Sequence, residues 1–346
     1  MKKSYEKFKE DLVKAIEEKL SEQQLEGVKC KLDTFDAPDG MKDRLTVSVE
    51  GTKMAMSFRL KEMYHDYLPS GMTFEKAVNK TISTIKANID VCKNNEKSVM
   101  DFVSDYDQVK ENLYLRLVPC TSPALADAPH KDIGDMALVA NIKLDNFMPG
   151  RDGVSCVMVR NDLLRIYGIS EEQLFTDARE NAVEKAPIEV MTLLEMYAKT
   201  MGISPEVVRA EMVGNNDKAE EKEAYVISTN DGNLGAAVLA YPNFADIVSN
   251  TVGKNVWVIP SSIHELILIP DTGEEKASEL DAMVKSTNKT SVSEREFLSD
   301  RCYHYDAVEK KLTLGVDYEA YKDKAEGINP ADLIKEAEID NDIDFF

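Results

Sequence analysis

Apolar residues recur at a four-residue spacing near the start of the chain. The members of this first series are Phe8, Leu12, Ile16 and Leu20. This spacing places them on one face of a helix, so it predicts an amphipathic helix over residues 5–21. A second long helix is expected from Thr73 to about Cys92, because threonine is a favourable N-cap and Glu75 lies in the first turn.

A two-residue alternation of apolar and polar positions replaces this spacing in several other segments. Residues 44–50 and 53–60 alternate on either side of Gly51-Thr52, which predicts a β-hairpin. Further strands are expected over residues 112–118 and 135–144. Helices followed by strands in this order predict an α+β unit over residues 1–148, with helices packed on a mainly antiparallel sheet.

A second α+β unit is predicted over residues 149–318, followed by an acidic tail with one short helix over 319–346. The boundary is placed at the turn-rich stretch Met148–Gly153, and the charged residues 215–223 are expected to form a linker or loop. Ser170 begins a capping box before a helix, and Pro187 is expected to open another helix through about Met201.

Residues 225–270 combine strand-like runs with polar turns. Residues 225–229 and 234–240 are expected to pair as a hairpin around an Asp-Gly turn, and a short helix is expected over 243–251. A last strand over 263–269 would place His264 and Glu265 on opposite faces of a sheet. These two side chains would then not act as one catalytic pair.

Composition is typical of a globular protein and excludes several classes of function. The chain of 346 residues is 43% hydrophobic, and it has no apolar run of the roughly 20 residues that span a bilayer. No signal-peptide core follows the N-terminus, so a cytoplasmic location is expected. The five scattered cysteines form no Cys-x-x-Cys pair, which argues against a disulfide framework and a four-thiolate zinc site.

A formal net charge of −21 disfavours binding to nucleic acid or to an anionic membrane. The charge leaves open an acidic DNA mimic that occupies a nucleic-acid-binding protein. Solubility alone also accounts for the charged helix faces and the acidic tail.

The weak candidates for chemistry are His130, Asp132, Asp135 and His264. The first three offer one imidazole and two carboxylates within six positions, which suits a divalent metal or acid–base chemistry. The simpler interpretation is a loop that enters a strand, with the carboxylates bonded to turn amides. No cofactor and no bound metal are predicted.

His264 stands close to a serine pair, Ser261-Ser262, which raises the question of a serine nucleophile with a histidine base. The flanking sequence has no Gly-x-Ser-x-Gly elbow. Leu268 occupies the position where a metalloprotease helix needs its second histidine. A core histidine with one hydrogen-bonded neighbour is the simpler interpretation.

Several segments, in this order and spacing, resemble a bacterial family catalogued only as a domain of unknown function, the DUF5688-like group. The segments are 129–139 (PHKDIGDMALV), 169–175 (ISEEQLF), 226–230 (VISTN), 259–265 (IPSSIHE), 298–300 (LSD) and 303–306 (YHYD). The resemblance covers roughly Tyr5 to Asp306 and implies an occurrence in anaerobic bacteria, in part on mobile elements. It carries no catalytic residue over to this chain.

The sequence therefore predicts a cytoplasmic, non-enzymatic interaction or regulatory protein whose partner is another protein, with a link to mobile elements. One alternative is a metal-dependent or acid–base hydrolase that uses His130, Asp132, Asp135 and His264. The other alternative is the acidic DNA mimic, which predicts surface carboxylates at the spacing of phosphates.

Overall fold

The computed structural model describes residues 3–25, 27–37, 40–52, 55–68, 72–144, 147, 156–212, 223–293 and 295–327. The chain is an α+β protein with three antiparallel sheets among these residues, as predicted. The expected boundary at Met148–Gly153, most of the expected linker at 215–223 and the short helix in the tail lie outside the described residues.

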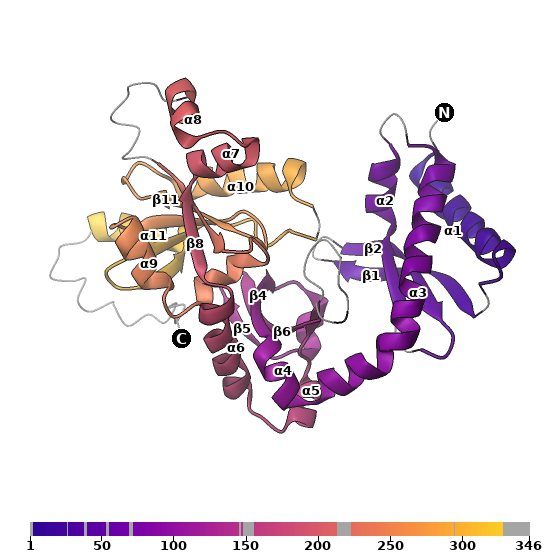
Figure 1. Ribbon diagram of the computed structural model, residues 1–346. Helices are drawn as coiled ribbons and strands as arrows, with labels where there is room; N and C mark the ends of the chain where they lie inside the picture. The colour runs from indigo at the N-terminus through magenta and orange to yellow at the C-terminus, as the bar shows by residue number, and fades with distance from the viewer. Residues whose placement is uncertain are drawn as a thin grey trace. The chain divides into compact units, whose positions relative to one another are not determined.

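The chain divides into two compact units. Unit 1 comprises Met1–Val109, Thr121–Ala124 and Leu144–Ser155, and unit 2 comprises Lys110–Cys120, Leu125–Lys143 and Cys156–Phe346. The main division therefore lies near residue 109 and differs from the expected one at 148. The strands expected in the first unit belong to unit 2, because β4 (Leu113–Pro119) packs against α6 (Glu171–Lys185) of that unit (Figure 1).

Unit 1 places helices on one face of a three-stranded sheet in the order β1-β2-β3. Its elements are α1 (Tyr5–Glu22), β1 (Val28–Ala37), β2 (Gly40–Val49), β3 (Ala55–Arg59), α2 (Leu60–Tyr67), α3 (Phe74–Ser104) and α4 (Tyr106–Val109). The expected first helix and hairpin are confirmed. Thr73 caps α3 by accepting a hydrogen bond from the Lys76 amide, and α3 continues well beyond Cys92.

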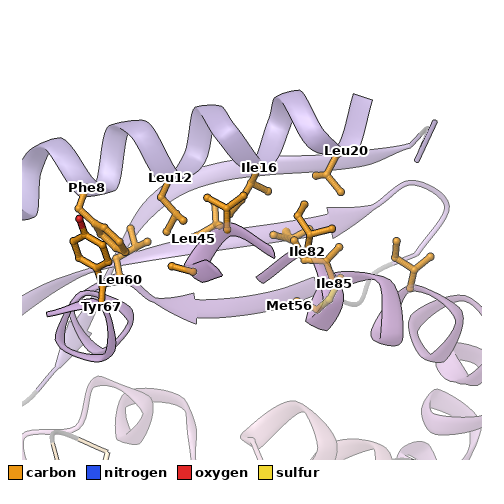
Figure 2. Close-up of a cluster of buried hydrophobic side chains, with 14 of the residues drawn as sticks. Phe8, Leu12, Ile16, Leu20, Leu45, Met56, Leu60, Tyr67, Ile82 and Ile85 are labelled. Carbon is orange, nitrogen blue, oxygen red and sulfur yellow. The ribbon is translucent and has the colours of Figure 1, made fainter. Parts of the chain in front are cut away.

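The core of unit 1 lies between its helices and this sheet. Figure 2 shows Phe8, Leu12, Ile16 and Leu20 of α1 along one side of the cluster, facing Leu45, Ile82 and the other labelled side chains. Phe8 is fully buried and stacks on Tyr67, with 5.0 Å between ring centroids. The four-residue spacing in the sequence thus marks the buried face of α1.

Unit 2 contains a four-stranded sheet, in which β6 lies between β4 and β5 and also pairs with β7, and a six-stranded sheet ordered β13-β12-β10-β11-β9-β8. Besides β4 and α6, its elements are η1 (Lys110–Asn112), β5 (His130–Ile133), β6 (Met136–Lys143), β7 (Cys156–Met158), α5 (Asn161–Tyr167), β8 (Ile188–Thr192), α7 (Leu193–Met201), α8 (Pro205–Met212), β9 (Tyr225–Thr229), η4 (Gly235–Ala240), α9 (Phe244–Thr251), β10 (Val256–Pro260), β11 (Leu266–Pro270), α10 (Ala277–Ser291), β12 (Tyr303–Asp306), β13 (Lys311–Leu314) and α11 (Gly315–Gly327); the short helix η2 (Pro123–Asp127) follows β4.

Two sequence predictions in this unit are wrong because β9 is a central strand. Residues 188–192 form β8 rather than the start of a helix, and they pair with β9 on one side. The stretch 234–240 was expected to pair with β9, but β11 pairs with it on its other side. With both edges of β9 filled, residues 235–240 coil into the 3-10 helix η4.

Candidate functional site

The tight turn between β5 and β6 meets the segment before β12. Asp135 lies in this turn, and its carboxylate accepts hydrogen bonds from the Ser299 hydroxyl, at 2.9 Å to each oxygen, and from the Tyr303 hydroxyl. The Asp135 amide donates back to the Tyr303 oxygen at 3.0 Å. Two segments that lie more than 160 positions apart, and that both resemble the same family, are therefore joined by one carboxylate.

The turn fits closely against the ring of Tyr303. Gly134 adopts a φ of +61°, and a Cβ on this residue would lie 2.5 Å from the tyrosine ring and hydroxyl. Tyr303 is completely buried. Burial and the neighbouring Asp135 carboxylate raise the pKa of Tyr303 well above its ordinary value, so its hydroxyl stays protonated and donates.

Helix α10 holds the same segment from the other side. The buried Asp281 carboxylate accepts from the Cys302 amide at 2.8 Å and from the Arg301 guanidinium at 2.9 Å. Asn288 donates to the Ser299 carbonyl and the Asp300 carboxylate, both at 2.8 Å. We call residues 296–304 the clasp segment, because its polar groups are bonded to α10 and to the β5–β6 turn.

His264 lies at the other end of the clasp segment. It belongs to the loop before β11, which begins at Leu266, so the prediction of a regular strand through His264 and Glu265 is wrong. The loop backbone bonds outside the sheet instead: the Ile263 amide donates to the Glu296 carbonyl at 2.8 Å, and the His264 amide donates to the Ser262 hydroxyl at 3.0 Å.

The ring of His264 is hydrogen-bonded to the backbone. Its Nδ1 accepts from the Leu234 amide at 3.1 Å, which leaves the proton of the neutral ring on Nε2, 3.9 Å from a carboxylate oxygen of Glu296. No hydrogen bond links the ring to a serine hydroxyl among the described residues. The arrangement therefore does not resemble a serine nucleophile with its histidine base.

His130 and Asp132 lie on the same face of β5, at the surface. His130 Nδ1 lies 2.8 Å from the Ala128 carbonyl, and its Nε2 lies 3.9 Å from an oxygen of the exposed Asp132. Cys120 Sγ is 3.8 Å from Asp132. Burial, together with the Asp132 and Asp135 carboxylates, raises the pKa of Cys120 to about 11, so the thiol is protonated at neutral pH.

These groups do not assemble a metal site. No set of three or more His, Cys, Asp or Glu side chains in the described part of the chain could hold a metal ion. Of the four candidate residues, Asp135 and His264 are linked through the clasp segment, while His130 and Asp132 pair with each other. Ser299, Tyr303 and Asp281 were not predicted from sequence, although the first two lie within family-like segments.

A third histidine, His304, forms a buried pair with a carboxylate. Its Nε2 lies 2.9 Å from Asp271, and its ring stacks on Tyr318 of α11 with 3.5 Å between centroids. Burial lowers the pKa of His304, although Asp271 opposes this effect. Burial raises the pKa of Asp271, but hydrogen bonds from the Gly273 amide and His304 outweigh it, so the net shift is downward.

We expect this pair to make unit 2 less stable in mild acid. The pKa of His304 is lower in the folded chain than the ordinary 6.5, so the unfolded chain binds a proton first as the pH falls below that value. The urea midpoint followed by the fluorescence of Trp257 should be lower near about pH 5.5 than near about pH 7.5. His304→Asn should reduce this difference and His130→Gln should not; an unchanged difference in His304→Asn would contradict the assignment.

The helices α7 and α8 expose an unusual amount of apolar surface. Four of their side chains and connecting residues are large, apolar and exposed by about half, and these residues form what we call the α7–α8 surface: Tyr197 (46%), Met201 (57%), Ile203 (42%) and Val207 (47%). The two helices contact each other, and Figure 1 shows them as neighbours at one end of unit 2. Exposed apolar residues that form a patch are typical of interaction sites.

Comparisons with known proteins identify a family but no characterised relative. A family model described as a family of unknown function matches residues 5–307. No curated protein and no solved structure matches the chain. Within the described residues, no helix is both long enough and apolar enough to cross a membrane.

Proposed function

The chain belongs to DUF5688, a family of unknown function, and we propose that it acts by binding another protein rather than by catalysis. The observation that carries this proposal is the α7–α8 surface. Its four exposed apolar side chains fall within eleven consecutive positions, from Tyr197 to Val207. When a partner covers apolar groups that are this exposed, the free energy of the complex falls by about 25 cal/mol per Å² of area removed from water.

Two of the four polar groups that were candidates for chemistry, Asp135 and His264, support the same proposal. The Asp135 carboxylate is bonded to two hydroxyls of the clasp segment, and His264 Nδ1 accepts from a backbone amide. Each of these contacts holds one stretch of unit 2 against another. They account for Asp135 and His264 through folding, without a substrate.

The wider setting of this function stays a prediction. A bacterial cytoplasm and a link to mobile elements rest on composition and on the family resemblance. The metal-dependent hydrolase and the acidic DNA mimic are separate predictions, and neither draws on the α7–α8 surface.

The proposal predicts a partner whose capture depends on the α7–α8 surface. We expect a chemical cross-linking experiment in host lysate to recover a protein with the unaltered chain and to lose it by about tenfold or more with Met201→Glu/Val207→Glu. Replacing two apolar side chains of a buried interface by charged ones lowers the affinity at least tenfold. The readout is the amount of each recovered protein by quantitative mass spectrometry.

Val308→Glu/Tyr321→Glu provides the matched control, because both side chains are more exposed (85% and 62%) and lie away from α7 and α8 in sequence. If both double variants recover the same proteins as the unaltered chain, the α7–α8 surface is not the binding site. A divalent metal retained by the purified chain and released by His130→Ala or Asp132→Ala would favour the hydrolase instead.

A further inference from the structure

Among the described residues, the three-stranded sheet of unit 1 has one face that the helices of this unit do not cover. The register pairs Leu45 with Leu32 and Phe58, and these side chains belong to the face that carries the buried core. Alternation then assigns the neighbouring positions to the opposite face. We call these nine positions the outer face: Lys29, Lys31 and Asp33 of β1, Arg44, Thr46 and Ser48 of β2, and Ala55, Ser57 and Arg59 of β3.

The outer face is positively charged, although the chain is strongly acidic. It carries four cations and one carboxylate, a local net charge of +3, against −21 for the whole chain. Lys29 is exposed and the Lys31 side chain is 73% exposed. Two further carboxylates border the face, Glu50 after β2 and Glu62 on α2. The sum of the charges on the face and at its border remains positive.

The local charge governs what can approach this face. At physiological ionic strength, exposed charges are screened beyond about 8 Å, so distant carboxylates contribute little there. Arg44 and Arg59 hold paired positions about 5 Å apart on adjacent strands, and Lys29 and Lys31 hold positions about 7 Å apart along β1, so each pair lies within that distance. An anionic group near the outer face is therefore attracted, in spite of the net charge of the chain.

Two arginines face each other across the strands at one end of this face. Arg44 and Arg59 are cross-strand partners, a like-charge pair that weakens a sheet. Asp33 lies 3.3 Å from Arg44, and Glu62 lies 3.5 Å from Arg59, so each charge is partly offset. The two neighbouring guanidinium groups concentrate positive charge at this end of the face, which supplies a reason for the pair beyond folding.

We propose that the outer face binds an acidic, extended segment of a partner protein. Carboxylates complement the four cations, and the exposed Ser57 adds a hydroxyl that can donate a hydrogen bond. Single-stranded nucleic acid is disfavoured because such binding stacks successive bases on several aromatic rings, whereas none of the nine positions is aromatic and the same alternation along β1 adds a single aromatic residue, Phe35. This site belongs to unit 1 and is independent of the α7–α8 surface, so it gives the chain a second binding function.

The test is a binding titration of the full chain with a fluorescein-labelled oligoglutamate peptide, followed by fluorescence anisotropy. We expect Lys29→Glu/Lys31→Glu to weaken binding about tenfold, because two attractions become two repulsions of a few tenths of a kcal/mol each. Binding to the unaltered chain should also weaken as salt is raised. Circular dichroism checks that this surface variant remains folded.

Lys14→Glu/Lys276→Glu is the matched control, because it changes the net charge equally at side chains that are 77% and 67% exposed. An equal loss in both variants would assign binding to the overall charge and overturn the proposal. No binding by the unaltered chain would overturn it too. So would binding of oligo(dT) in place of the peptide, since that result assigns the face to nucleic acid.

Discussion

Phe8→Ala is expected to lower the free energy of unfolding of unit 1 by about 3–5 kcal/mol, the range found for large aromatic side chains removed from a core. Phe8 is fully buried. Its ring lies 5.3 Å from that of Tyr64, 5.0 Å from Tyr67 and 6.0 Å from Phe74, measured between centroids. Alanine removes all three contacts and leaves a cavity among these rings.

Urea unfolding followed by far-ultraviolet circular dichroism measures this loss. Trp257 is the single tryptophan and lies buried in unit 2, so its fluorescence follows the other unit. Met100→Ala on α3 serves as the control, since that side chain is 47% exposed and its removal should change stability by about 0.5 kcal/mol or less. A loss below about 1 kcal/mol in Phe8→Ala would refute the packing described for this core.

Gly134→Ala is expected to destabilise unit 2 by about 2–5 kcal/mol. Part of this is the positive φ of +61°, which an alanine adopts at a penalty of about 1–2 kcal/mol. The rest comes from the collision of the new Cβ with Tyr303, whose ring is buried and has no room to move, at about 1–3 kcal/mol. The same shift would disturb the hydrogen bonds of Asp135 to Ser299 and Tyr303.

Gly232→Ala separates these two contributions. Gly232 has nearly the same φ, +67°, but no atom lies within 4 Å of its added Cβ. It should therefore lose only the backbone part, about 1–2 kcal/mol, when both variants are unfolded in urea and followed by Trp257 fluorescence. Equal losses in the two variants would show that the turn does not press against Tyr303.

The elements predicted well from sequence are those whose pattern depends on a single buried face. The helix α1 shows its four core residues at helical spacing, and the hairpin of β2 and β3 shows strict alternation. Residues 188–192 were misassigned because they form a strand by pairing with β9, and residues 234–240 were misassigned because β8 and β11 already occupy both edges of β9. Local composition does not reveal which edges of a strand are occupied.

The candidate residues illustrate the same limit. Asp135 and His264 were selected because a carboxylate and an imidazole can carry chemistry, and each is bonded to groups far away in the chain. Ser299 and Tyr303 gave no such signal by residue type. Only the resemblance of their segment to the same family pointed toward them.

The sequence by itself determined the α+β class, the family and the acidic character of this protein, because each of these depends on local periodicity or on composition. The tertiary structure decided that β4–β6 belong to unit 2 and which groups Asp135 and His264 bond to. It also decided which charged and apolar side chains lie on the same surface. These features depend on contacts between residues distant along the chain. A net charge of −21 does not reveal a cationic sheet face, since charge is summed over the sequence but acts over about 8 Å in space.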